Sequence, residues 1–283
     1  MQLSDEAVTT PEVKSWQGLH LLHFQGSACS QKVRIFLAEK GITWESHPVD
    51  LLRQAHATPW FLGINPRGVV PVLVHDGVVH VESNDIMEYL DELPSPVPSF
   101  FPQNASERAR VRESLALEDS LHMDLRTITM GFLVPYALAK KSPKVLEAYE
   151  QSGAPDTKRD KEVAWWRAFA KDGVPPDQAR ASLRAFAAAF DTLEQWLRAN
   201  TWLIGQRISV LEIAWFISLH RLVCAGYPIK RHPRLKTHYE SLLKRPSFAQ
   251  EITTPGLPGL ILSFYSGFQR LRGHTLARTM AEA

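Results

Sequence analysis

Residues 65–83 read NPRGVVPVLVHDGVVHVES, and this stretch carries the strongest fold signal in the chain. Asp76-Gly77 separates two valine-rich runs, and an Asp-Gly pair in that position predicts a β-hairpin closed by a type I′ turn. Pro71 lacks an N–H and can adopt the cis form, which exposes the backbone N–H and C=O of Val70 at the edge of the sheet. A backbone edge of this kind can pair with a peptide ligand as a short extra strand.

Strand and helix patterns alternate around this hairpin, over residues 19–93. Runs at 19–24 and 43–49 predict strands, and the run between them predicts a helix that ends at Gly41, which suits a left-handed C-cap. A short helical turn precedes the hairpin, and we expect Ser83 to be the N-cap of the helix that follows it. The order β-α-β-α-β-β-α predicts a small α/β domain.

A proline-rich segment, PSPVPSFFP, ends this domain, because proline neither continues a helix nor supplies a central strand. β signals nearly vanish after it, which predicts an all-helical second half. The polar composition of residues 141–180 predicts an insertion with one short helix around Trp165-Trp166. The sequence therefore predicts a flexible leader at 1–17, an α/β domain at 18–94, a linker at 95–103 and a helical domain at 104–283.

Capping residues and apolar stripes predict the helices of the second half. Asn104 and Glu107 form a capping-box pair at the start of a long helix, and Ser209 with Glu212 forms another. The run after Ser209, VLEIAWFISLHRLV, is apolar on nearly every face, which predicts a buried central helix. Two stripes at helical spacing mark the remaining long helices: Leu121, Leu125, Ile128 and Phe132, and Leu183, Phe186, Phe190, Leu193 and Leu197.

Composition excludes several classes of protein. The formal net charge is only +2 among 283 residues, so nucleic acid and membrane are not expected as main partners. No stretch reaches the roughly 18 apolar residues of a membrane span, and the polar start lacks the core of a signal peptide. Two cysteines without CxxC spacing indicate a reducing compartment, so we expect a cytoplasmic protein. The 11 histidines show no metal-ligand spacing, so no metal site is expected.

The segment GSACSQKV at 26–33 links the first strand to the first helix and carries the main catalytic candidates. A helix N-terminus presents unpaired N–H groups and a partial positive charge, which stabilise an anion such as a thiolate. A serine hydroxyl there can donate a hydrogen bond to the sulfur and lower its pKa. Ser27 and Ser30 are both available, and Cys29 lies between them.

Glu82-Ser83 combines an acid with a helix start. Free N–H groups suit a carboxylate and the neighbouring acid suits an ammonium, so the pair fits the head group of an α-amino acid.

These segments resemble the glutathione transferase family in order and spacing, over nearly the whole chain. SACSQKVRIFLAEKG resembles the serine-type theta, phi and delta classes, which implies that Ser27 contacts the glutathione thiolate. NPRGVVPVL resembles the family's NPxGxVPxL pattern, which implies a cis peptide bond at Pro71 and main-chain contacts to glutathione at Val69 and Val70. The resemblance also implies that Glu82-Ser83 holds the γ-glutamyl group and that His56 lies near the glycine carboxylate.

The same resemblance implies a thioredoxin-like N-terminal domain, an all-α second domain and a homodimer that serves detoxification. Glutathione is the implied cosubstrate, and a small hydrophobic electrophile is the implied second substrate, bound in an apolar cleft between the domains. His122, Met123, Arg126 and Met130 are candidates to line that cleft. The region around WWRAFAKDG is similar to bacterial β-etherase-type transferases, which implies aryl ether cleavage as one activity.

The chain departs from the family pattern at several positions, and two other functions stay open. Cys29 stands where the family often has proline, so a thiol-disulfide reductase with Cys29 as nucleophile is one alternative. Asn84 and Ala57 replace residues that add polar contacts in some classes, and a glutathione-binding module without turnover is the other alternative. Glu212 stands where the second domain's capping box usually has aspartate.

Overall fold

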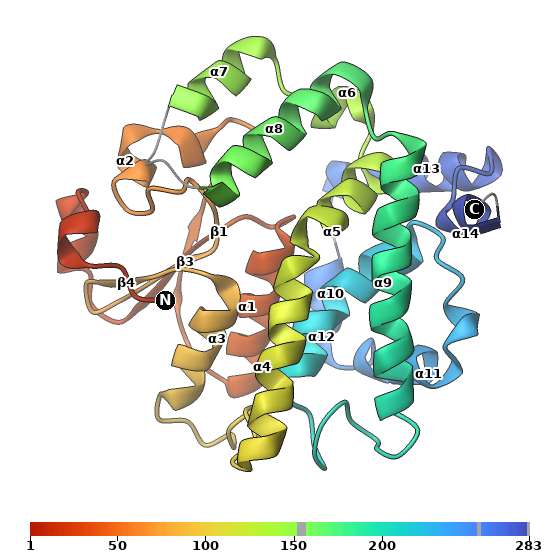
Figure 1. Ribbon diagram of the computed structural model, residues 1–283. Helices are drawn as coiled ribbons and strands as arrows, with labels where there is room; N and C mark the ends of the chain where they lie inside the picture. The colour runs from red at the N-terminus through yellow and green to blue at the C-terminus, as the bar shows by residue number, and fades with distance from the viewer. Residues whose placement is uncertain (152–156, 254–255, 282–283) are drawn as a thin grey trace. The chain divides into compact units, whose positions relative to one another are not determined.

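The computed structural model describes residues 1–151, 157–253 and 256–281 (Figure 1). The chain divides into two compact units, Met1–Pro98 with Lys141–Ala170, and Ser99–Lys140 with Lys171–Ala283. The boundary after Pro98 falls inside the expected linker. Most of the expected insertion belongs to the first unit, although we expected it within the helical domain; its residues 152–156 lie outside the described residues.

A four-stranded sheet with strand order β2-β1-β3-β4 forms the centre of the first unit. β1 and β2 are parallel, and β3 is antiparallel to both β1 and β4. This arrangement, with helices between and after the strands, is the thioredoxin-like domain expected from the sequence. The strands are β1 (Leu19–His23), β2 (Glu45–Pro48), β3 (Val72–His75) and β4 (Val78–His80).

Two local predictions about backbone conformation are confirmed. Asp76 and Gly77 have φ values of 48° and 81°, as a type I′ turn requires. Gly77 also lies close to the leader, because a Cβ there would lie 2.3 Å from the carbonyl oxygen of Lys14. Gly41 adopts the left-handed conformation at the end of α1 and donates its N–H to the carbonyls of Leu37 and Ala38.

Residues 1–17, which we expected to form a flexible leader, pack against the sheet. They contain 3₁₀ turns at Asp5–Ala7 and Pro11–Ser15, and Val13 is fully buried. Val13 belongs to one apolar cluster with Leu22, Val72 and Phe61. The helices of the first unit are α1 (Ala28–Lys40), α2 (Pro59–Leu62), α3 (Ser83–Glu92), α7 (Pro143–Gln151) and most of α8 (Thr157–Asp172), with a 3₁₀ turn at Ala55–Ala57.

The described residues of the second unit form helices and the loops between them, with no strand, as expected. Its elements are α4 (Ala105–Ser120), α5 (His122–Ile128), a π-helical turn at Thr129–Leu133, α6 (Tyr136–Ala139), α9 (Pro176–Trp196), α10 (Val210–Cys224), a 3₁₀ turn at Ile229–Arg231, α11 (Pro233–Leu242), α12 (Pro246–Ile252), α13 (Gly256–Leu271) and α14 (Leu276–Ala281).

α10 is the buried central helix that its composition predicts. Ten consecutive residues from Val210 are buried, and α10 packs against α4, α5 and α11. The capping box is complete, because Glu212 accepts the backbone N–H of Ser209 at 2.7 Å while the Ser209 hydroxyl caps the helix. The long helix expected after Asn104 is divided into α4 and α5 at Leu121, although both predicted stripes are buried.

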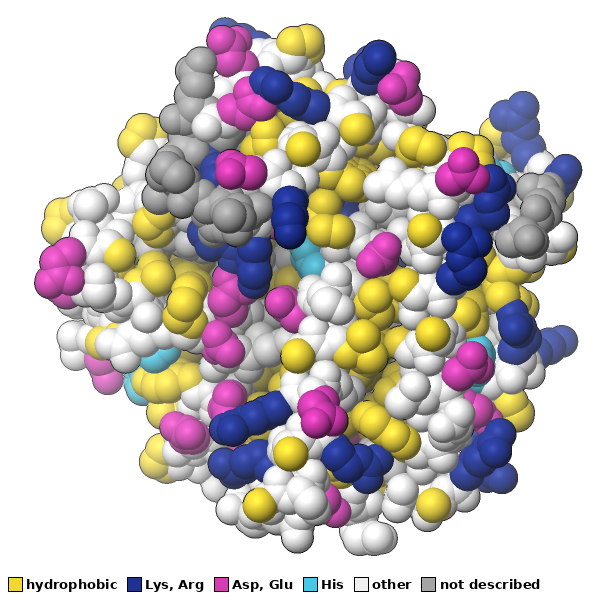
Figure 2. Space-filling view, viewed as in Figure 1, with side chains coloured by type: hydrophobic (Ala, Val, Ile, Leu, Met, Phe, Trp, Pro, Cys, Tyr) yellow, Lys and Arg dark blue, Asp and Glu magenta, His cyan; other side chains and the backbone are white. Residues whose placement is uncertain are grey.

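The face of the molecule drawn in Figure 2 shows no dominant charge among its described residues. Acidic and basic side chains are interspersed on the face drawn in Figure 2, which agrees with the net charge of +2. Within the described residues, no helix combines the length and apolarity that crossing a membrane requires.

Candidate functional site

The register of the sheet brings three candidate segments to one end of the first unit. Leu22 lies opposite Val72, and Leu73 lies opposite His80. Continuing the two registers beyond the strands places Phe24 opposite Val70 and Pro71 opposite Glu82. The loop after β1, the bend before β3 and the residues after β4 therefore lie at the same end of the sheet.

Ser27 caps the helix that begins in the first of these loops. Its side-chain oxygen accepts the backbone N–H of Ser30 at 3.3 Å, and its φ and ψ of −79° and 123° are typical of an N-cap. The side chain is partly exposed, and the described residues offer no acceptor for its hydroxyl proton. The hydroxyl is therefore able to donate a hydrogen bond to an anion at the start of α1.

Ser30 and Cys29 occupy different surroundings from Ser27. Ser30 is fully buried, and its hydroxyl oxygen accepts the backbone N–H of Phe24 at 3.4 Å, so it fastens α1 to the end of β1. Cys29 lies in the first turn of α1 and is partly exposed. Of the two candidate hydroxyls, only that of Ser27 reaches the surface.

A buried arginine holds the loop that leads to Ser27. Arg34 donates to the carbonyl oxygens of Phe24 and Gln25 at 3.2 and 3.1 Å, and to Nδ1 of His23 at 3.0 Å. Because arginine only donates, Nδ1 of His23 is the acceptor, and Nε2 carries the proton that is donated to Ser46. Burial, followed by the charge of Arg34, lowers the pKa of His23 to about 4. The neutral ring and the cation together fix the loop.

The bend before β3 leaves one residue's backbone unpaired. The Val70–Pro71 peptide bond is cis, and neither the N–H nor the C=O of Val70 has a hydrogen-bond partner among the described residues. Val69 differs, because its carbonyl accepts the side-chain amide of Asn65 at 2.9 Å. Backbone groups at a buried edge are normally paired, so Val70 is open to pairing with a ligand.

Glu82 is the N-cap of α3, which corrects the prediction that Ser83 has this place. Ser83 is the first helical residue, and the Glu82 side chain makes no capping hydrogen bond. Glu82 has φ of 65°, a conformation that costs a non-glycine residue of the order of 1–3 kcal/mol and that is found at binding sites. Its carboxylate forms an ion pair with Arg67 and lies 3.7 Å from Nζ of Lys158.

The region 141–170 adds cations to this part of the first unit. Arg159 is buried and donates to the carbonyl oxygen of Arg67 at 2.7 Å, beside Gly68, whose φ is 65°. Burial, then the charges of Lys141 and Arg159, lower the pKa of His56 to about 4. His56 is therefore neutral at pH 7, and it lies near two cations and the carboxylate of Glu162, so its surroundings carry a net positive charge that suits a carboxylate ligand.

Sequence reasoning missed these cations. Lys141, Lys158 and Arg159 were read as a solvated polar insertion, and Arg67 as part of a turn motif. The cluster KRDK at 158–161 was the available signal, but Arg67, the partner of Arg159, lies 92 positions earlier in the chain. Arg159 is only 4 % exposed, which a charged run does not suggest.

The cleft-lining candidates of the second unit lie close to one another on α5. Arg126 donates to the sulfur of Met123 at 3.3 Å and lies 3.4 Å from Nε2 of His122. Met130 follows on the π-helical turn, and all four side chains are partly exposed. They form the face of this segment that does not carry the buried stripe.

Residues 26–93 match the description "Glutathione S-transferase, N-terminal domain". These residues contain all the catalytic and glutathione-binding candidates. Protein LigF of Sphingobium sp. strain SYK-6 is 30 % identical over 200 residues, which cover 70 % of this chain and 76 % of LigF. The chain belongs to the glutathione transferase family. Members of this family use glutathione as a cosubstrate.

Two further comparisons agree with this assignment. Glutathione S-transferase 1 of Dianthus caryophyllus is 43 % identical over 93 residues, which cover 33 % of this chain and 42 % of that protein. The crystal structure of the beta-etherase LigF from Sphingobium sp. strain SYK-6 has a TM-score of 0.72 and 27 % identity, and covers 83 % of this chain and 98 % of LigF. The thioredoxin-like and helical units are therefore both shared with a solved transferase structure.

Proposed function

We propose that the protein activates glutathione as a thiolate at the start of α1, for attack on a small hydrophobic electrophile. The observation that carries this proposal is the partly exposed Ser27 hydroxyl at a helix N-terminus, on the same sheet end as the unpaired backbone of Val70 and the carboxylate of Glu82. The described arrangement supplies a hydrogen bond for the sulfur, a backbone edge for the peptide and an acid for its ammonium.

The Ser27 hydroxyl and the start of α1 can together supply the free energy that thiolate formation needs. A free thiol of this kind has a pKa of about 8.5, so a bound pKa of about 6.5 requires roughly 2.7 kcal/mol. A hydrogen bond to a charged group contributes about 1.5–3 kcal/mol, and a helix start about 0.3–1 kcal/mol. Ser27 and the first turn of α1 together supply the required amount.

The two ends of the tripeptide are assigned by charge. The α-ammonium of the γ-glutamyl group pairs with Glu82, and its carboxylate accepts N–H groups at the start of α3, where Ser83 lies. The glycine carboxylate lies near neutral His56, with Lys141 and Arg159 supplying positive charge. The cysteinyl backbone between them pairs with the free N–H and C=O of Val70.

Aryl ether cleavage is the specific reaction that the relationship to LigF supports. The thiolate attacks the carbon of the ether, a C–S bond forms, and the C–O bond breaks. The leaving phenolate takes up one proton, equal to the one that the thiol releases. The products are one thioether and one phenol, and the reaction needs neither an oxidant nor a reductant.

The test compares turnover of an aryl ether and of a simple aryl halide by the wild type, Ser27→Ala and Cys29→Ser. We expect thioether formation in the wild type and in Cys29→Ser, and a large loss in Ser27→Ala at neutral pH. A glutathione-dependent disulfide reduction that Cys29→Ser abolishes, while thioether formation is spared, would instead indicate the thiol-disulfide reductase, since Cys29 lies in the first helical turn. Tight glutathione binding without any turnover would indicate the binding module. Sedimentation of the purified protein tests the homodimer that we infer from the family.

A further inference from the structure

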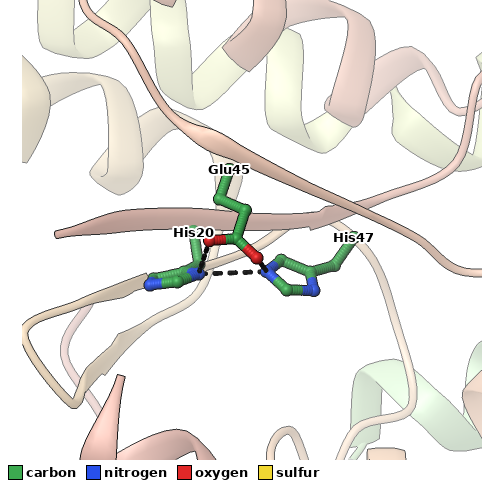
Figure 3. Close-up of side chains that lie close together, drawn as sticks. All are labelled: His20, Glu45 and His47. Carbon is green, nitrogen blue, oxygen red and sulfur yellow. Dashed lines mark hydrogen bonds and ion pairs between the residues drawn. The ribbon is translucent and has the colours of Figure 1, made fainter. Parts of the chain in front are cut away.

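A cluster of two histidines and one glutamate lies on the sheet of the first unit, apart from the glutathione segments (Figure 3). His20 is on β1, and Glu45 and His47 are on β2. The parallel register aligns His20 with Glu45, and residues two apart on a strand share a face, so all three side chains project from the same side. The cluster lies near the start of both strands, whereas Ser27 follows the end of β1.

We propose that Nδ1 of His20, Nε2 of His47 and the carboxylate of Glu45 bind one divalent transition-metal ion of the zinc type. Two imidazoles and one carboxylate are a donor set that zinc prefers. Three protein ligands leave one position of a tetrahedral site for water or another ligand.

Two of the three separations between the ligand atoms match such a site, and the third is shorter. Nδ1 of His20 and Nε2 of His47 are 3.0 Å apart, at hydrogen-bond distance. Oε2 of Glu45 lies 3.5 Å from Nδ1 of His20, and Oε1 of Glu45 lies 3.4 Å from Nε2 of His47. Ligands at 2.0–2.2 Å from a tetrahedral zinc ion lie about 3.3–3.5 Å from one another. The nitrogen-to-oxygen separations exceed the usual hydrogen-bond range of about 2.7–3.2 Å, so Glu45 lies at ion-pair distance from both rings without a direct hydrogen bond to either.

A second hydrogen bond sets the tautomer of His20. Its Nε2 lies 2.9 Å from the carbonyl oxygen of Gln17, which can only accept, so Nε2 carries the proton. Nδ1 therefore presents its lone pair to the cluster, where it accepts the Nε2 proton of His47, and a metal ion that binds both nitrogens replaces this proton. A ligating histidine commonly donates its other N–H to a carbonyl in this way, which fixes the ring.

Packing holds the two rings while the third ligand stays accessible. Trp16 stacks on His47 with ring centroids 4.4 Å apart and an angle of 13°, and it also contacts His20. The side chains of His20 and His47 are 9 % and 26 % exposed, whereas that of Glu45 is 65 % exposed. β2 is an edge strand, so an ion can approach from the side of Glu45.

The experiment is calorimetric titration of the full chain, without any histidine tag, with zinc chloride. We expect one ion per chain in the wild type and at least a tenfold weaker affinity in both Glu45→Gln and His47→Gln, since loss of even an outer-shell partner costs 10–100-fold. His75→Gln is the matched control, because His75 lies in the same sheet and contacts the carboxylate of Asp76 at 3.4 Å, but belongs to no group of three metal-ligating side chains among the described residues. It should bind zinc like the wild type.

Cobalt(II) substitution gives an independent reading of geometry. The visible absorption of four-coordinate cobalt should appear in the wild type and in His75→Gln and be lost in Glu45→Gln. Because the Glu45 side chain is exposed, its replacement by glutamine should leave the fold intact. The proposal is overturned if the wild type binds no zinc, if Glu45→Gln binds as tightly, or if His75→Gln loses as much affinity. None of these outcomes depends on glutathione turnover, so the two proposals fail separately.

Discussion

Replacing Ser27 by alanine should raise the pKa of bound glutathione by about 1–2 units. The substitution removes the hydroxyl at the start of α1 and leaves the helix field in place. The hydrogen bond to the thiolate is worth about 1.5–3 kcal/mol, and each pKa unit corresponds to 1.36 kcal/mol. From a bound pKa of about 6.5, the thiolate fraction at pH 6.5 would fall from about one half to between roughly one tenth and one hundredth.

Ultraviolet titration of bound glutathione measures this shift directly, because the thiolate absorbs and the thiol does not. The rate of thioether formation should fall about 5- to 50-fold at pH 6.5 and recover as the pH approaches 9. Ser27→Thr, which keeps a hydroxyl, should behave like the wild type.

Matched variants separate activation from helix capping. Ser27 also accepts the N–H of Ser30, and loss of an N-cap by alanine costs about 0.5–2 kcal/mol of stability, whereas glycine costs only a few tenths. Ser27→Gly should therefore shift the pKa as alanine does, with a smaller loss of stability. Ser30→Ala should lower stability, because it leaves the N–H of Phe24 unpaired, and should leave the pKa unchanged. A thiolate band that titrates identically in the wild type and Ser27→Ala would refute the assignment.

Three further outcomes follow from the structure. Arg159→Ala should raise the KM for glutathione about tenfold with little change in kcat. Arg167→Ala is the control, because Arg167 lies on the same helix with a side chain that is 60 % exposed, and it should leave the KM unchanged. An equal rise in KM in both variants would exclude a binding role for Arg159. Burial lowers the pKa of His80 to about 4 in the folded protein. Below pH 6.5 the unfolded chain therefore binds more protons at this residue than the folded chain does, so the free energy of unfolding falls as the pH falls. His80→Gln should remove about 2 kcal/mol of the decrease in unfolding free energy between pH 7 and 5, measured in urea, and an unchanged pH slope would contradict this. Glu212→Ala should cost about 2–4 kcal/mol, because the N–H groups of Ser209 and Leu203 lose their acceptor; an unchanged urea midpoint would contradict it.

The features that the sequence determined are those that depend on a few neighbouring residues. The turn at Asp76-Gly77, the left-handed end of α1 at Gly41 and the capping box of Ser209 and Glu212 were all predicted correctly. Each is set by backbone sterics or by a hydrogen bond that spans at most four residues. The apolar stripes were also predictable, because a repeat of 3.6 residues reports which side of a helix is buried.

Interactions between distant segments were decided by the tertiary structure alone. No spacing in the sequence links His20 with Glu45 and His47, because only the parallel register of β1 and β2 aligns them. Arg159 likewise contacts the carbonyl of a residue 92 positions earlier, and a polar composition gave no sign that it would be buried.

The N-terminal segment 1–17 is another part of the chain whose packing could not be predicted from the sequence. Residues 1–17 have few strong local preferences, yet Val13 is fully buried because the face formed by Leu22 and Val72 requires a cover. Local preferences are encoded residue by residue, whereas strand register and the docking of segments depend on the sum of many weak contacts along the whole chain.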